Sequence, residues 1–445
     1  MKYLKAILPV MLFAMVACKQ KNKSTEYLTK FKDPILYCKT VKKLNDVVLE
    51  NNFPPVIASR NYVYANIAAY ECMAAGDSNY TSLHQQIKHL PAMPKPSAEA
   101  PINFSLAALL SFTKVGNAVT FPEGSMMGYY DELRNMADSL GMPEEVLKNT
   151  ITYSDSVVAT ILRWSKKDNY AQTRTAEKYA VKQNVEGRWI PTPPMYASSL
   201  EPHWCEIRTM VLDSAAEFTA APPPAFDVKN KNSTYYKAVC EVKNIGDSLT
   251  EEQKNIADFW DDNPFKLNVV GHASYATKKF SPPGHWMNIV GIASKKAGAD
   301  FNTTVAAYTQ TAIALFDGFI GCWNQKFHSN TIRPETVINT YFTDIWRPYI
   351  QTPPFPSYVS GHATISAAAA EIMTNWFGDN LSFNDTSQLE FGIKSRTIQS
   401  FREGSKEAAM SRLYGGIHFR HDNDQGNILG TKIGTFILQR LKFKK

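Results

Sequence analysis

Long Ala-rich segments separated by proline clusters constrain the fold of this 445-residue chain more than any other feature. Thr304–Phe316 and Ser360–Phe377 lack glycine after their first turn, and Asn427–Leu441 has apolar residues at helical spacing. The chain shows no series of alternating strands and no Asn-Gly hairpin turn. These patterns predict an all-α fold with long loops where proline clusters.

The proline clusters also suggest how the helices are divided. They stand at Pro191–Pro194, Pro222–Pro224, Pro282–Pro283 and Pro353–Pro356. The run Ala221–Ala225 is the best candidate for an internal boundary, and its short length favours two packed bundles over two independent domains. We therefore expect two packed helical bundles, an N-terminal region over residues 41–220 and a C-terminal domain over residues 221–445 that carries the active site.

The N-terminus has the pattern of a targeting segment. Residues 1–17 combine two lysines with a twelve-residue apolar run, which is too short to span a membrane and fits a secretory signal. The residues before Cys18 resemble a bacterial lipobox, although an ordinary signal peptide that contains a cysteine is the alternative. We expect an exported lipoprotein of the periplasm or outer membrane, attached only through lipid on Cys18, with residues 18–40 as a polar tether.

The charge pattern bears on the partners. The formal net charge of +7 is dispersed along the chain without a long Lys/Arg block, so no nucleic-acid surface is expected. A positive balance suits an enzyme with anionic ligands. The oligomeric state is left open.

A first basic motif is KFHSNTIRP, in which Lys326 and Arg333 stand seven residues apart. A helix would place both side chains on one face, two turns apart, with Pro334 ending the segment. An arginine fork and a lysine point charge then converge on one anion. Taken alone, such a pair is more typical of a solvated helix face.

A second motif, PPFPSYVSGH, opens an Ala-rich helix. Ser360 is a good N-cap residue, and Gly361 lets an anion approach the helix N-terminus. His362 beside that anion is able to exchange a proton near neutral pH. A capped helix with a surface histidine is the simpler alternative.

A third motif, SRLYGGIHFRHD, contains Arg412, His418 and Asp422. If this segment is helical, Asp422 lies one turn from His418 and fixes the tautomer of its ring. A polar helix face is the alternative. Together the three motifs describe a cage for a tetrahedral or trigonal-bipyramidal oxyanion, either phosphate or vanadate.

The order of these motifs resembles the superfamily that unites type-2 phosphatidic acid phosphatases with vanadium-dependent haloperoxidases. The first and third motifs match its pattern, and in the second Val359 replaces a proline. The Pro-Pro-Phe-Pro run, Trp323 and the upstream segments WIPTPP, FWDD and PPGHW are similar to bacterial haloperoxidases. The residues of these motifs look most similar to those of flavobacterial vanadium-dependent iodoperoxidases.

This resemblance implies vanadate as the cofactor, with a ring nitrogen of His418 bonded to its vanadium atom. It implies that the remaining oxygens receive hydrogen bonds from five residues: Lys326, Arg333, Ser360, Gly361 and Arg412. His362 would act as the acid–base group toward hydrogen peroxide. The expected reaction oxidises a halide, with iodide favoured and bromide possible, to hypohalous acid, and small organic acceptors are possible.

Three further residues follow from the resemblance. Trp323 and Phe355 are candidates for the halide side of the pocket, although core packing explains both aromatics equally well. Asp262 is expected to pair with Arg412, with Asp261 as an equal contender.

A phosphatase is the alternative function. An exported acid phosphatase would use the same cage on phosphate monoesters, with His418 as the nucleophile of a phospho-histidine intermediate and His362 protonating the leaving oxygen.

Overall fold

The structure is a computed structural model that describes residues 25–264, 266–270 and 273–445. The expected signal peptide and Cys18 lie outside the described residues.

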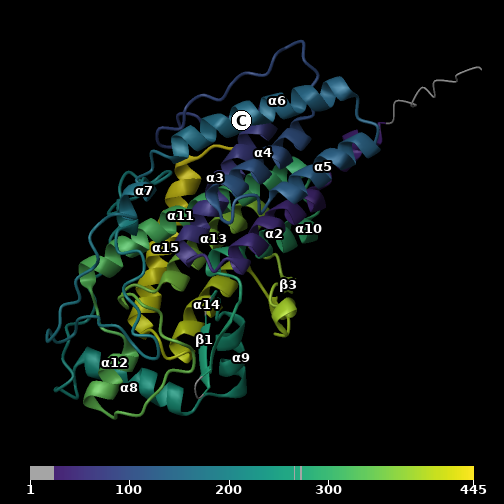
Figure 1. Ribbon diagram of the computed structural model, residues 1–445. Helices are drawn as coiled ribbons and strands as arrows, with labels where there is room; N and C mark the ends of the chain where they lie inside the picture. The colour runs from purple at the N-terminus through teal and green to yellow at the C-terminus, as the bar shows by residue number, and fades with distance from the viewer. Residues whose placement is uncertain (1–24, 265, 271–272) are drawn as a thin grey trace, which may run out of the picture.

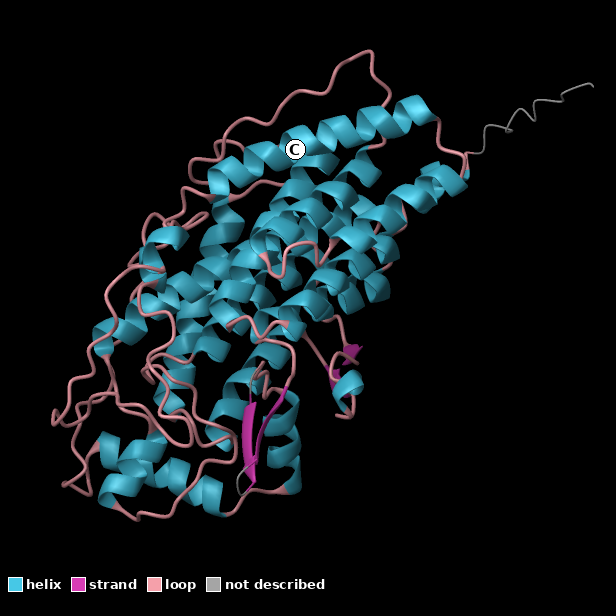
Figure 2. Cartoon of the chain, in the orientation of Figure 1, coloured by secondary structure: helices cyan, strands magenta, loops and turns pink. Residues whose placement is uncertain are grey.

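The described chain is built of helices joined by long loops (Figures 1 and 2), so the all-α prediction is confirmed. The helices up to residue 206 are α1 Glu26–Lys30, α2 Pro34–Glu50, α3 Pro55–Ala75, α4 Phe104–Val119, α5 Met127–Ser139, α6 Glu144–Ser165, α7 Tyr170–Thr173 and the short 3₁₀ turn η1 Trp204–Glu206. The later helices are α8 Thr234–Asp247, α9 Glu251–Phe259, α10 Pro282–Ala297, α11 Phe301–Ser329, α12 Pro334–Tyr341, α13 Gly361–Phe377, η2 Leu389–Phe391, α14 Phe401–Tyr414 and α15 Arg420–Arg440.

Four short strands were not expected from the sequence. They are β1 Lys266–Val270, β2 Ala273–Thr277, β3 Phe383–Asp385 and β4 Arg396–Ile398. They pair antiparallel as two separate two-stranded sheets, β1 with β2 and β3 with β4. Both are small additions at the side of the helices (Figure 2).

The centre of the molecule is α11, which packs against α13, α15 and α3. Helix α11 is long and apolar enough to cross a membrane, but its most apolar window is entirely buried by protein, as in a core helix. One hydrophobic cluster runs from Phe31 near the start to Phe443 near the end of the chain. Helices on both sides of residue 221 therefore share a core, and the domain boundary at that residue stays a prediction.

Local sequence signals explain where several helices begin. The side chains of Asp300, Ser281 and Ser360 accept first-turn N–H groups at the starts of α11, α10 and α13. The expectation of a loop at Pro282–Pro283 was wrong, because these prolines occupy the first positions of α10, where their missing N–H groups cost nothing.

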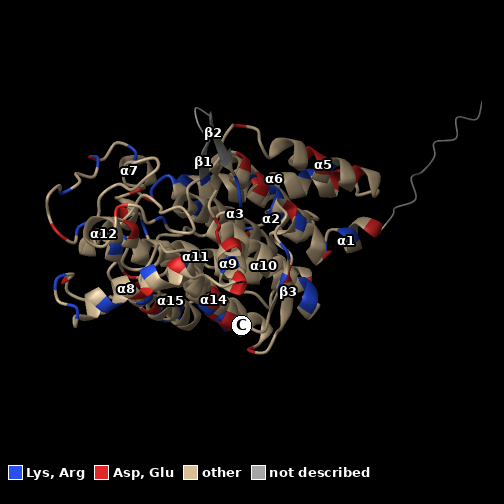
Figure 3. Cartoon of the chain, turned by 90° about the horizontal axis from the view of Figure 1, so that it is seen from below, with Lys and Arg blue, Asp and Glu red and all other residues tan. Residues whose placement is uncertain are grey.

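The expected tether extends less far than residue 40. Residues 26–30 and 34–50 form α1 and α2, and the side chains of Phe31 and Tyr37 are fully buried in the core. Their burial removes aromatic surface from water and stabilises this segment against the core. The prediction of a polar tether up to residue 40 did not take these two aromatic side chains into account. Along the ribbon, Lys and Arg are interspersed with Asp and Glu (Figure 3).

Candidate active site

The three motifs meet at one end of the α11–α13–α15 core. The first comes from the end of α11 and the start of α12, the second from the start of α13, and the third from α14 and the turn before α15. The tight packing of α13 against α15 brings the second and third motifs together, and Ser360 N–H donates to the Asp422 carbonyl at 3.0 Å.

His418 is the most constrained side chain of the site. Its Nδ1 lies 2.9 Å from Asp422 Oδ2, and its Nε2 lies 3.0 Å from Arg333 Nη1. The carboxylate accepts the Nδ1 proton, so Nε2 carries a lone pair toward the cage. The pairing with Asp422 agrees with the sequence reading, but His418 lies in the turn before α15, not in a helix.

Asp422 has further partners. It accepts hydrogen bonds from Ser357 Oγ at 2.5 Å and from the Phe419 N–H at 3.3 Å. Burial by itself raises the pKa of this carboxyl, but these bonds and the neighbouring histidines hold it far below its usual range. Ser357 was not selected from the sequence, although it stands in the second motif.

Lys326 and Arg333 converge, but not on one helix face as expected. Helix α11 ends at Ser329, Asn330 adopts a left-handed conformation, and Arg333 is the N-cap residue of α12. Pro334 therefore begins a helix instead of ending one. Both cations are fully buried against the loop at residues 355–357.

The bonds of these two cations leave capacity for a ligand. Lys326 Nζ donates to the carbonyls of Pro356 and Ser357, each at 2.9 Å. Arg333 donates from Nε to Phe355 O and from Nη1 to Ile417 O, whereas its buried Nη2 has no partner among the described residues. Burial lowers the pKa of Lys326 to about 7 and that of Arg333 to about 9.

The second motif places a helix N-terminus at the cavity. Ser360 caps α13 by accepting the Ala363 N–H, as predicted, and Gly361 and His362 form its first turn. The Nε2 atom of His362 has no hydrogen-bond partner among the described residues and lies 3.8 Å from Asp262 Oδ2. Burial and then the charge of Arg412 hold the pKa of His362 well below its usual range, so the free ring is neutral.

Arg412 does not form the expected ion pair with Asp262 or Asp261. Its Nη2 donates to the Trp260 carbonyl at 2.6 Å and its Nε donates to Ser411 Oγ at 3.1 Å. Burial lowers the pKa of Arg412, and both carboxylates lie close enough to oppose that shift by their charge. Asp262 instead accepts from His285 and Gln388, and Asp261 lies 3.8 Å from Lys266 Nζ.

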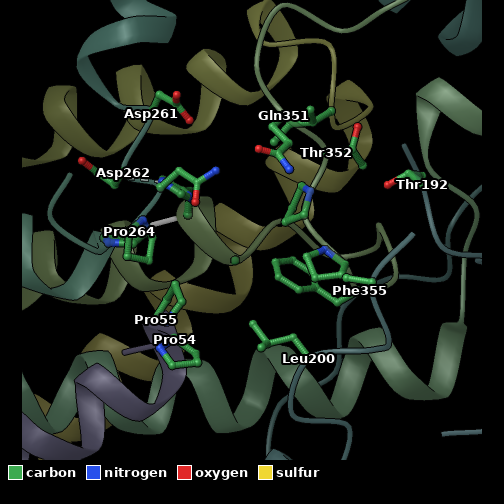
Figure 4. A pocket seen from close by; sticks show the side chains of 18 of the residues that line it. Pro54, Pro55, Thr192, Leu200, Asp261, Asp262, Pro264, Gln351, Thr352 and Phe355 are labelled. Carbon is green, nitrogen blue, oxygen red and sulfur yellow. Dashed lines mark ion pairs between the residues drawn. The ribbon is translucent and has the colours of Figure 1, made fainter. Parts of the chain in front are cut away.

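A cavity of about 320 Å³ opens onto Gly361, His362, Arg412 and His418. Figure 4 shows Asp261 and Asp262 on one side of it and Phe355 on the other. Several prolines line the cavity, among them Pro54 and Pro55 at the start of α3, and residues of the segment 192–200 line it from a long loop. The N-terminal helical region thus contributes to a site that was expected in the C-terminal domain alone. The segment WIPTPP contains the lining residues Thr192 and Pro193, whereas no local motif marked Pro54 and Pro55.

The two predicted pocket aromatics lie beside the cations. Phe355 and Trp323 have ring centroids 5.0 Å apart, and the Phe355 ring lies 5.0 Å from both Lys326 Nζ and Arg333 Cζ. Each ring therefore shields a buried positive charge from water as well as lining the cavity.

These groups together suit an oxyanion. Three cations, Lys326, Arg333 and Arg412, are buried near each other, while the carboxylate of Asp422 is engaged with His418. Buried charges without full compensation are costly, and an anion held by their free N–H groups removes that cost. The unpartnered Arg333 Nη2 and the lone pair of His418 Nε2 fit an anion whose central atom accepts a nitrogen ligand.

Comparisons with known proteins agree with this geometry. Residues 306–444 match the family model of the second helical-bundle domain of vanadium chloroperoxidase. The crystal structure of a bacterial vanadium-dependent iodoperoxidase is 40% identical, with a TM-score of 0.87 over 93% of this chain and 97% of that one.

More distant structures share the fold. A bacterial vanadium-dependent chloroperoxidase in its holo form is 17% identical with a TM-score of 0.66, over 88% of this chain and 93% of that chain. Its apo form is 16% identical with a TM-score of 0.65, over 88% and 95%. No curated protein matches the chain.

Proposed function

Because the chain belongs to the vanadium-dependent haloperoxidase family, an enzyme family that uses vanadate, we propose that it oxidises halide with hydrogen peroxide and prefers iodide. The observation that carries this proposal is His418 Nε2, whose lone pair faces Arg333 Nη1 at 3.0 Å, beside the Nη2 of the same arginine, which has no partner among the described residues. The preference for iodide is supported by the likeness to the iodoperoxidase.

Different residues of the cage would bind different atoms of the cofactor. His418 Nε2 would supply the bond to vanadium, and Lys326, Arg333 and Arg412 would neutralise the oxyanion. Ser360 and the first N–H groups of α13 would donate to the remaining oxygens. When bound, vanadate supplies a Lewis acid that activates peroxide toward the halide.

His362 is the proton carrier of the proposed reaction. Its Nε2 faces the cavity unpartnered, and the neutral ring is ready to accept a proton from incoming hydrogen peroxide. Asp262 Oδ2, at 3.8 Å, stabilises the imidazolium that results. Overall, two electrons pass from halide to the O–O bond, one proton is taken up, and hypohalous acid and water leave.

The direct test uses the purified protein incubated with orthovanadate. Oxidation of iodide, bromide and chloride by peroxide is measured with and without vanadate, alongside hydrolysis of a phosphate monoester. We expect vanadate-dependent activity with the highest kcat/KM for iodide. Peroxidase activity that is independent of vanadate, together with fast phosphate-ester turnover, would instead support the phosphatase.

We also propose that the enzyme is exported and anchored by lipid on Cys18. The support is the sequence pattern of residues 1–18 alone. Metabolic labelling with a fatty acid in a bacterial host tests it, with Cys18→Ala as the comparison. Equal labelling of both proteins, or no labelling of either, would reject the anchor.

A further inference from the structure

Behind the active site lies a buried ionic cluster that the proposed reaction does not use. The His285 ring, on α10, is completely buried between Asp262, in the loop after α9, and Asp385, at the end of β3. Its Nδ1 lies 2.9 Å from Asp262 Oδ1, and its Nε2 lies 2.9 Å from Asp385 Oδ2. The ring stacks on Trp260, with centroids 4.8 Å apart.

This arrangement defines the charge of the ring. A neutral imidazole has one N–H group and one lone pair, so one of its nitrogens would repel the carboxylate that it faces. Only the imidazolium donates to both carboxylates. Burial alone lowers the pKa of His285, but the two carboxylates outweigh it and raise the pKa to about 10.

The cluster reaches the active site through one residue. Asp262 Oδ1 also accepts from Gln388 Nε2 at 2.8 Å, and its Oδ2 lies 3.1 Å from His285 Nδ1 and 3.8 Å from His362 Nε2. Asp262 lines the cavity (Figure 4), and its charge acts on Arg412. Asp385, His285, Asp262 and His362 thus form a row in which each carboxylate faces an imidazole.

We propose that His285, held as a cation between Asp385 and Asp262, is a positioning residue that keeps Asp262 ionised and aimed at His362. Without this cation, Asp262 would be a buried carboxylate with only an amide donor and the more distant Arg412. The ion then stabilises the protonated His362 that forms when peroxide gives up its proton. This role rests on the proposed peroxidase reaction, whereas the charge of the ring does not.

Several charged groups surround the cluster. They come from several elements: Asp261, Asp262, Arg412, His362, His418 and Asp385. Replacing His285 by glutamine removes the cation and leaves Asp262 buried with the Gln388 amide as its neighbouring side-chain donor. The variant therefore loses the charge-assisted hydrogen bond that holds Asp262 beside His362.

The kinetic test compares kcat of His285→Gln with that of wild type at saturating vanadate. We expect kcat to fall about 10- to 100-fold, the range found when a supporting partner is lost. Vanadate affinity, measured by ⁵¹V NMR, should change much less than kcat, because His285 does not line the cavity. An unchanged kcat, or a loss of vanadate affinity as large as the loss of kcat, would overturn the proposal.

Asp262→Asn and the double variant sharpen this test. Asp262→Asn removes the carboxylate charge that faces His362, so kcat should be low, and adding His285→Gln should cause little further loss. Independent, multiplying losses would show that His285 does not act through Asp262. His203→Gln, which removes a partly exposed histidine paired with Glu206, is the matched control and should leave kcat unchanged.

A wild-type measurement keeps the proposal testable if the variant does not fold. Histidine-selective ¹⁵N NMR of the vanadate-free protein at pH 8 should show one ring with both nitrogens protonated and contacts to the Trp260 ring. A neutral His285 ring would refute its proposed role as a cation between Asp385 and Asp262, even if the enzyme oxidises halide. Absence of peroxidase activity with an intact imidazolium signal would instead refute the proposed function.

Discussion

Asp422 Oδ2 lies 2.9 Å from His418 Nδ1, and this contact decides which ring nitrogen faces the cage. In Asp422→Asn, rotation of the amide turns its N–H₂ toward Nδ1 and moves the ring proton to Nε2. A protonated Nε2 has no lone pair for a metal, so we expect vanadate affinity to fall about 10- to 100-fold. Titration by ⁵¹V NMR measures this loss.

The neighbouring Asp424→Asn is the matched control. Asp424 is exposed on the same helix, so its substitution should leave vanadate affinity unchanged. Equal affinity in Asp422→Asn and wild type would show that the tautomer of His418 does not govern binding.

Alanine substitutions of His418 and His362 are expected to affect different properties, vanadate binding in the first and kcat in the second. His418→Ala removes the nitrogen ligand, so no vanadate binding should be detected. His362→Ala keeps the cage, so binding should persist while kcat falls about 10²- to 10⁴-fold, the usual contribution of a general acid–base. Equilibrium binding and steady-state kinetics on both variants separate these outcomes, and equal vanadate binding by wild type and His418→Ala would refute the ligand assignment.

Lys326 makes anion binding depend on pH. Burial lowers the pKa of its ammonium to about 7 in the vanadate-free enzyme, so the group is charged below pH 7 and loses its charge above it. A bound anion favours the charged form, hence vanadate affinity should weaken as pH rises from 6 to 8. The measurement is the ratio of affinities between wild type and Lys326→Met, which cancels the protonation of vanadate itself.

That ratio should decline with pH. The exposed Lys432→Met should behave like wild type at every pH. A ratio that is constant from pH 6 to 8 would show that Lys326 does not titrate in this range.

The helices and the cage could be predicted from the sequence because their signals are local. Helical spacing, the N-cap at Ser360 and the four-residue separation of His418 and Asp422 depend on nearby residues only. The seven-residue separation of Lys326 and Arg333 led to the wrong prediction of a shared helix face, because that prediction also used local spacing alone. Both side chains reach one place although a left-handed residue, Asn330, ends the helix between them.

What could not be predicted depends on contacts between distant segments. Asp385 meets His285 across one hundred residues, and Pro54 reaches the cavity from the N-terminal region. No periodicity in the sequence encodes such long-range contacts. The predicted pairing of Arg412 with an acidic side chain was wrong, because the Trp260 carbonyl accepts from its Nη2.

Gly430 shows that the cage depends on close contact between α13 and α15. A Cβ atom at this position would lie 1.9 Å from the Thr364 carbonyl oxygen, one turn beyond the capping residue Ser360. Gly430→Ala should therefore push the two helices apart and lower the free energy of unfolding by about 1–3 kcal/mol, as overpacking typically does. Urea unfolding measures this change.

The same substitution should weaken vanadate binding, because Ser360 and His362 lie at the start of α13 and Asp422 lies in the first turn of α15. Gly128→Ala, on α5, is the control, since its Cβ would meet no atom within 4 Å. Its helix gains up to about 1 kcal/mol from the lower chain entropy of alanine. If Gly430→Ala unfolded at the same urea concentration as wild type and bound vanadate equally, the cage would not require this helix contact.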